Sequence, residues 1–141
     1  MKKLIMIVVM SLTGIALQGQ IPQPFEIVVE NVKDNEGILM VALFNSEETF
    51  TSKPWRGDRP AAEKGTMHVY FSDVPPGNYA IAVYHDANKN SKMDKNLLGI
   101  PKEGYGFSND VMGSFGPPSY ENAQIQWTGT ETYTIHLTYP K

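Results

Sequence analysis

Short stretches in which hydrophobic and polar residues alternate recur along most of the chain. In the stretch 66–72, Met67, Val69 and Phe71 fall on one face of an extended chain and polar side chains fall on the other. An alternation of period two is typical of a strand that packs on one face. The same pattern predicts further strands at 25–32, 79–84, 124–127 and 132–139.

The stretch 38–45 is apolar on both of its faces. This pattern is typical of a central strand that is covered on both sides. The residues at 35–37, Asn-Glu-Gly, form a turn signal between it and the preceding strand at 25–32. We therefore predict that 25–32 and 38–45 pair as a β-hairpin.

Turns rich in proline and glycine separate the predicted strands. The stretch 74–77 reads Val-Pro-Pro-Gly, in which proline fixes φ and glycine permits a sharp turn. No stretch shows a sustained helical period. These features predict an all-β fold, an antiparallel Greek-key β-sandwich of the Ig-like kind, with about seven strands joined by long ordered loops.

The first residues have the pattern of a secretory signal peptide. Lys2 and Lys3 precede an apolar run at 4–17, which is short for a membrane span. We expect residues 1–19 to be a signal peptide and 20–141 to form one domain, exported to the periplasm or secreted, with no membrane span after cleavage. An uncleaved anchor helix is the alternative.

The net charge and the absence of cysteine exclude some classes of function. Removal of Lys2 and Lys3 with the signal peptide takes the basic count from 12 to 10 against 15 acidic residues, a net charge of −5. An acidic domain of this kind is not expected to bind nucleic acid. The chain has no cysteine, which excludes disulfides and thiol catalysis.

Two longer motifs resemble known families. The pattern F-x-x-V-P-P-G-x-Y-x-I-x-V at 71–83 is similar to that of transthyretin-like and prealbumin-like β-sandwiches. The string Y-H-D-x-N-x-N-x-x-x-D-x-N-x-L-G-I-P-x-E-G-Y-G-F-S-N at 84–109, followed by F-G-P-P at 115–118, resembles the bacterial exported family called domain of unknown function 2141, DUF2141. The second resemblance covers essentially the whole mature chain. It implies a periplasmic or secreted β-sandwich and no particular activity.

Oxygen-bearing side chains alternate within the second motif. Asp86, Asn88, Asn90 and Asp94 have the spacing of positions 1, 3, 5 and 9 of a calcium-binding loop, and the backbone carbonyl of Lys92 falls at position 7. Calcium takes six to eight hard oxygen ligands, which a tightly turning loop can supply from alternate residues. The spacing therefore indicates a weak calcium site at 86–94.

The loop also departs from that pattern. Ser91 stands where glycine is usual, and Leu97 stands where a bidentate acid is usual. A missing ligand is expected from Asn96, Glu103 or water. The alternative is a polar hairpin loop built from Asx-turns, in which aspartate and asparagine side chains bond their own backbone.

A second long connection, 99–120, is rich in aromatic residues spaced by glycine and proline. Tyr105, Phe107, Phe115 and Tyr120 provide either a platform for a sugar or peptide, or a loop whose rings complete the core. The first interpretation makes the protein a carbohydrate-binding module, with Trp55 as a further candidate ring.

The sequence contains no established catalytic motif. His68, His85 and His136 are expected on the surface, and Ser108 has no identified base. We therefore expect a non-enzymatic binding or structural module of the cell envelope, with an envelope protein or a glycan as partner. A small hydrolase of an envelope substrate is the alternative.

Overall fold

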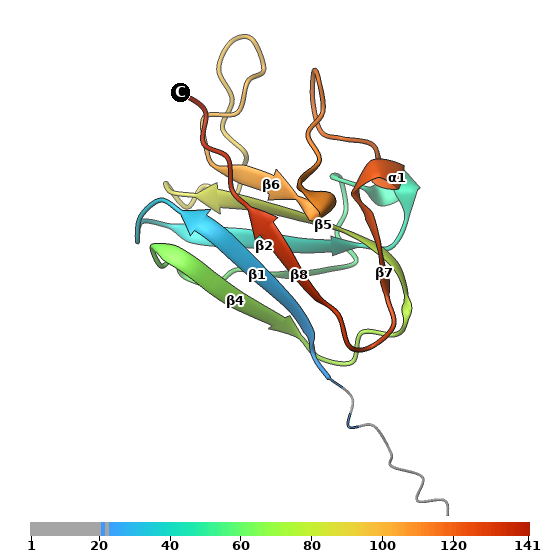
Figure 1. Ribbon diagram of the computed structural model, residues 1–141. Coiled ribbons are helices and arrows are strands. Elements are labelled where there is room, and N and C mark those ends of the chain that lie inside the picture. Colours follow the sequence, from blue (N-terminus) through green and yellow to red (C-terminus); the bar gives the residue numbers. More distant parts are fainter. Residues whose placement is uncertain (1–20, 22) are drawn as a thin grey trace, which may run out of the picture.

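The computed structural model describes residue 21 and residues 23–141. The predicted signal peptide, 1–19, lies outside the described residues. The described chain forms two β-sheets that pack face to face (Figure 1). The elements, in chain order, are β1 (Phe25–Val32), β2 (Ile38–Phe44), η1 (Glu47–Thr49), β3 (Arg56–Asp58), β4 (Gly65–Phe71), β5 (Gly77–Asp86), β6 (Tyr105–Phe107), η2 (Ser108–Asp110), α1 (Tyr120–Ala123), β7 (Gln124–Trp127) and β8 (Thr132–His136).

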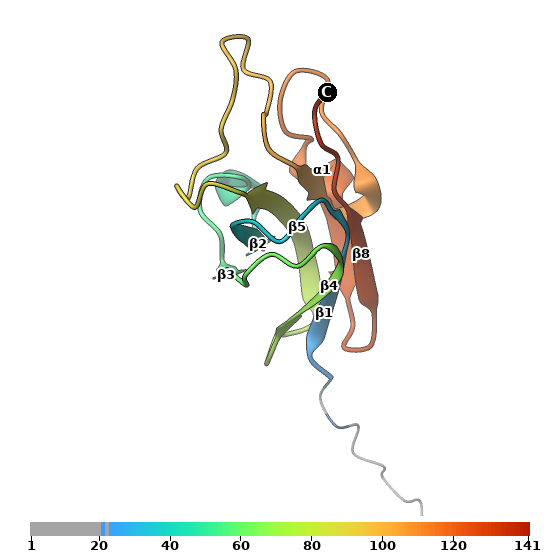
Figure 2. The same ribbon diagram turned by 90° about the vertical axis from the view of Figure 1, so that its left-hand side faces the viewer.

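The sheet order confirms the predicted all-β sandwich. One sheet has the order β4-β1-β8, and the other has the order β3-β2-β5-β6, with β7 also paired to β5. The turned view separates the two layers (Figure 2). One pair departs from the antiparallel prediction, because β8 runs parallel to β1. A parallel neighbour is available here because β8 enters the sheet after a long excursion through the other one.

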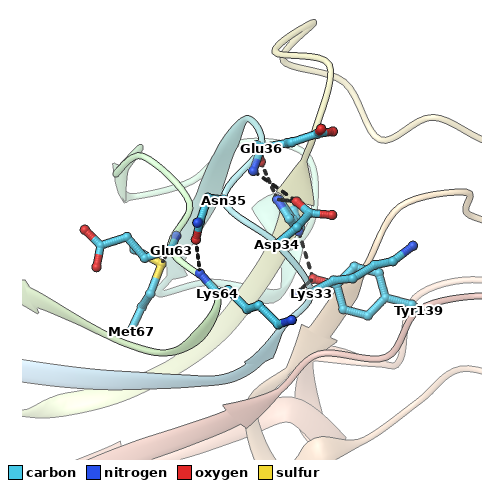
Figure 3. Close-up of polar contacts among 9 residues, drawn as sticks. Lys33, Asp34, Asn35, Glu36, Glu63, Lys64, Met67 and Tyr139 are labelled. Atoms are coloured by element: carbon cyan, nitrogen blue, oxygen red, sulfur yellow. Dashed lines mark hydrogen bonds and ion pairs between the residues drawn. The ribbon is translucent and has the colours of Figure 1, made fainter.

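The predicted hairpin between 25–32 and 38–45 is wrong, since β1 and β2 lie in different sheets. The residues at 33–37 cross between the layers instead of reversing within one. Polar contacts hold this crossing in place (Figure 3). Glu36 N donates to Asp34 Oδ1 at 3.0 Å, and Lys64 N donates to Asn35 Oδ1 at 2.6 Å. The crossing is thus bonded to Lys64, directly before β4, and β2 continues from it into the opposite layer.

The inner faces of both sheets carry the side chains that the alternation predicts. Val69 and Phe71 of β4 and Ile135 of β8 are buried in the main core, with Met67 packed against it. Strand β2 is buried on one face and, except for Phe44, half-buried on the other, so the predicted cover on both sides is partial. Its Leu39, Val41 and Leu43 enter the main core, whereas Phe44 joins a second cluster with Ala80, Tyr120 and Ala123.

The Val-Pro-Pro-Gly turn carries the chain from β4 to β5, and so from one sheet to the other. Two buried aromatic side chains bond to its backbone. The Tyr79 hydroxyl donates to Pro75 O at 2.7 Å, and Trp127 Nε1 donates to Val74 O at 3.0 Å. Both rings also pack around Phe25 in the core. The turn is therefore fixed by the core as well as by its prolines.

Candidate functional site

Asp86 anchors the loop that follows β5. Its side chain is fully buried, at 0 % exposure. Oδ1 accepts a hydrogen bond from Asn90 N at 3.1 Å, and Oδ2 accepts one from Ser91 N at 2.7 Å. Ser91 has a φ of 62°, in the left-handed region where glycine is usual in calcium loops. The serine therefore adopts the turn that the spacing requires, and Asp86 holds its backbone.

The carboxylate of Asp94 accepts hydrogen bonds from the side chains of both asparagines in the loop. Asn88 Nδ2 donates to Asp94 Oδ2 at 2.6 Å, and Asn90 Nδ2 donates to Asp94 Oδ1 at 2.9 Å. The amide oxygens face the backbone instead: Asn88 Oδ1 accepts from Asn90 N, and Asn90 Oδ1 accepts from Lys92 N. These last two bonds are the Asx-turn contacts of the alternative interpretation.

Glu103 brings a third carboxylate to the loop from the segment that leads back to β6. It is 9 % exposed, and its Oε2 accepts from Asp94 N at 3.1 Å. Burial raises the pKa of Glu103, and the nearby charges of Asp94 and Asp86 raise it further. Of the candidates for a missing ligand, Glu103 lies beside the loop. Asn96 instead uses its Oδ1 to accept from Leu98 N and Ile100 N at the tip.

These contacts define the donor set available to a cation. Across the part of the chain that the structure describes, no three His, Cys, Asp or Glu side chains lie close enough to share a metal ion. A cation in this loop therefore depends on amide and carbonyl oxygens, because Asp86, Asp94 and Glu103 do not converge on one metal position in this structure. Such neutral oxygens are usual calcium ligands.

His85 is buried, which corrects the prediction that all three histidines lie on the surface. It is 2 % exposed. Its Nε2 donates to Glu36 O at 2.6 Å, and its Nδ1 lies 2.8 Å from the hydroxyl of Tyr139. The inward alternation of β5, at Tyr79, Ile81 and Val83, continues to this residue. Extending the period by two positions would have identified it from the sequence.

His68 and His136 are exposed, as expected, and β1 separates their strands. His68 Nδ1 lies 2.7 Å from Glu26 Oε1. His136 lies between two carboxylates, with Nδ1 2.7 Å from Asp110 Oδ2 and Nε2 3.0 Å from Glu30 Oε2. The hydrogen bond to Asp110, together with its charge, raises the pKa of His136. The ring borders a shallow cavity of about 200 Å³ beside η2.

Ser108, the serine for which the sequence shows no base, is held by backbone groups. It is 1 % exposed, and its hydroxyl donates to Ala123 O. The same oxygen accepts from Ile81 N at 2.9 Å. Ser108 therefore joins β5 to the end of α1. Its hydroxyl is fully used by backbone groups.

The candidate aromatic residues do not share one surface. Tyr120 is buried, and Tyr105 and Phe107 are half-buried with their ring planes at 73° to each other. Trp55 packs on Tyr79 in the core. Phe115 is fully exposed. The loop 99–120 thus places Tyr120 in the second core cluster, while Phe115 projects into solvent.

None of the helices formed by residues 21 and 23–141 has the length and apolar composition needed to cross a bilayer. No curated protein and no solved structure matches the chain. The profile of one family, described as uncharacterised proteins conserved in bacteria, matches residues 27–135. That match begins in β1 and ends in β8, so it spans both sheets and the loop at 86–94. The chain is therefore a member of the DUF2141 family.

Proposed function

We propose that this protein is an exported, non-enzymatic binding module of the cell envelope that takes up calcium weakly in the loop 86–94. The proposed ligands are the side-chain oxygens of Asp86, Asn88, Asn90 and Asp94 and the carbonyl of Lys92. Glu103 is the proposed additional acid, in place of the usual acid at the position of Leu97.

The observation that carries this proposal is the approach of two asparagine amides and one buried glutamate to Asp94. Both Nδ2 groups, which carry partial positive charge, point at the Asp94 carboxylate. Rotation of either amide by a half-turn about its last bond presents an oxygen in the same place. A cation would then take over the role of the two NH₂ groups beside Asp94. Asp86 and Glu103 would have to move toward it, since the three carboxylates do not share one metal position in this structure.

Two features indicate that the affinity is low. Lys89, Lys92 and Lys95 are exposed in and beside the loop, and their charges oppose cation binding. The amide oxygens also have to give up the Asx-turn bonds that they make to the backbone. Affinities of extracellular calcium modules lie at about 10⁻⁴–10⁻³ M, which suits the exported location that we propose.

Two observations favour a binding module over the alternatives. The Ser108 hydroxyl, which a hydrolase would use as nucleophile, is engaged by Ala123 O and Ile81 N. A carbohydrate platform requires coplanar exposed rings, whereas Tyr105 and Phe107 meet edge to face.

The test is the melting temperature of chelator-treated protein with and without millimolar calcium. Ligand binding to the folded state alone raises the melting temperature by mass action. We expect a rise in the wild type and its loss in Asp94→Asn, which keeps the shape of the side chain and removes its charge. Glu63→Gln removes one charge from an exposed position outside the loop and should keep the rise.

An unchanged melting temperature in the wild type would contradict the proposal. An equal rise in the wild type and in Asp94→Asn would show that calcium binds elsewhere. Magnesium serves as a second control, because its strict octahedral geometry and reluctant dehydration do not suit this ligand set.

A further inference from the structure

Two loops carry exposed hydrophobic side chains at or near their tips. The first joins β5 to β6 and presents Leu97 and Leu98, with Ile100 beside them. The second joins η2 to α1 and presents Phe115 and Met112. Leu97 and Phe115 are as accessible as side chains in an extended peptide. Exposed apolar clusters of this kind usually mark an interaction site.

Both loops project from the same end of the sandwich. The two views agree that their tips extend beyond the sheets side by side, opposite the end where the chain enters β1 (Figures 1 and 2). We call this pair of loops, residues 87–104 and 111–119, the loop end. Any flat or fluid surface that meets the loop end contacts both apolar tips together.

The first tip is ordered by a single side chain. Asn96 Oδ1 accepts from Leu98 N at 2.9 Å and from Ile100 N at 3.0 Å. Asn96 N donates to Ile100 O, and Gly99 N donates to Asn96 O, each at 2.9 Å. The N–H groups of Leu98, Gly99 and Ile100 at the tip are therefore already paired. This pairing lowers the cost of moving the tip into an apolar environment, where unpaired backbone groups are unfavourable.

The charges of the loop end differ from those of the rest of the protein. The whole chain carries a net charge of −3, whereas residues 87–104 contain four lysines and two acids, Asp94 and the buried Glu103. The lysines, all exposed, are Lys89, Lys92, Lys95 and Lys102. The second loop, 111–119, has no charged residue. Apolar tips accompanied by four exposed lysines on an acidic protein are complementary to an anionic apolar surface.

We infer that the loop end docks on the surface of an anionic lipid bilayer. Leu97, Leu98 and Phe115 enter the boundary between headgroups and acyl chains, and the lysines contact the lipid phosphates. A bilayer fits this surface better than a folded protein does, because two separate protruding tips need a partner that deforms around each. The inference does not depend on calcium, since the lysines themselves supply the attraction.

The test places a fluorescent probe at each tip of the full chain. Leu97→Trp and Phe115→Trp are mixed, in chelator, with vesicles of phosphatidylcholine containing about 30 % phosphatidylglycerol. We expect a blue shift of the added tryptophan and its quenching by brominated lipids, and neither with phosphatidylcholine alone. The wild-type signal of Trp55 and Trp127 is subtracted. Tyr70→Trp, an exposed aromatic position on β4, is the matched control and should not shift.

A second experiment reverses the charge of lysines in the loop end. The pair Lys92→Glu and Lys95→Glu should weaken binding to the anionic vesicles about tenfold or more, while Lys64→Glu, outside the loop end, should change it much less. Three results would overturn the inference: no shift at either tip, an equal shift at Tyr70→Trp, or a tip shift that grows with protein concentration without vesicles. The last result would assign the tips to a second copy of the chain.

Discussion

Nδ1 of the buried His85 lies 2.8 Å from the hydroxyl of Tyr139, which is 54 residues further along the chain. The same hydroxyl accepts from Lys33 N at 3.0 Å, and His85 Nε2 donates to Glu36 O. Because Nε2 donates to a carbonyl, Nδ1 is the accepting nitrogen of the ring, and the Tyr139 hydroxyl donates its hydrogen to it. One tyrosine thus connects the crossing between the sheets, the end of β5 and the C-terminal segment, directly beside the root of the loop 86–94.

This relationship predicts that Tyr139→Phe destabilises the protein. Loss of the hydroxyl leaves Nδ1 of buried His85 without its donor, and a buried unpaired group costs about 1–3 kcal/mol. The free energy of unfolding, measured by urea denaturation, should fall by about that amount. Tyr84→Phe is the control, since the Tyr84 hydroxyl bonds to none of the described residues, and its effect should stay below about 0.5 kcal/mol. Equal effects of the two substitutions would contradict the assignment.

Substitutions at Gly37 and Gly99 can be compared to test how tightly the chain packs against Asp86, where the loop 86–94 begins. Both have left-handed φ values, 75° and 77°. A Cβ at Gly37 would lie 2.0 Å from Asp86 O, whereas one at Gly99 meets open space. Gly99→Ala should therefore cost only the conformational penalty, about 1–2 kcal/mol. Gly37→Ala adds a backbone clash, and we expect a loss of about 3 kcal/mol or more in unfolding free energy. A similar loss for both variants would mean that Gly37 is not packed on Asp86.

The raised pKa of His136 predicts a pH dependence of stability. Its ordinary value is 6.5, and the folded protein holds the proton more tightly than the unfolded chain does. The stabilisation is therefore complete below about pH 6 and is lost as pH rises through the folded-state pKa. The urea midpoint should fall over this range in the wild type. Asp110→Asn removes the main partner and should flatten the dependence. An unchanged dependence would show that another group is responsible.

Glu103 gives the corresponding prediction for an acid. Its pKa is raised above the ordinary value of 4.5, chiefly by burial, so the folded state favours the neutral form. The wild type should lose stability relative to Glu103→Gln as pH rises through the folded-state pKa. Gln keeps an oxygen that accepts from Asp94 N. The check is the difference between the two urea midpoints from about pH 4 to 7. A difference that does not change with pH would contradict the prediction.

The sequence predicts the strands well because their signal is local. Met67, Val69 and Phe71 alternate with polar residues, and a strand needs no more information than that to define its buried face. The hairpin prediction failed because nothing in 33–37 specifies which sheet receives the next strand. That choice depends on distant contacts, among them the bond from Lys64 N to Asn35.

In the loop at 86–94, too, some features can be predicted from the local sequence and others depend on distant contacts. The spacing of Asp86, Asn88, Asn90 and Asp94 is local and can be read from the sequence. Serine at position 91 gives no such signal, and its left-handed φ is seen only in the structure. Two other properties depend on the tertiary structure. The contact of Glu103 with Asp94 N forms only when the chain returns from the tip. The exposure of Phe115, in contrast to buried Tyr120, follows from which ring reaches the second core cluster.

The most direct test of the proposed function locates calcium on the chain. Amide chemical shifts of isotope-labelled protein are followed while calcium is added to the chelator-treated sample. Binding at 86–94 predicts saturable shifts concentrated at Asn90, Ser91, Asp94 and Glu103, and their absence in Asp94→Asn. Shifts confined to residues outside 86–103, or no saturable shifts at millimolar calcium, would contradict the account.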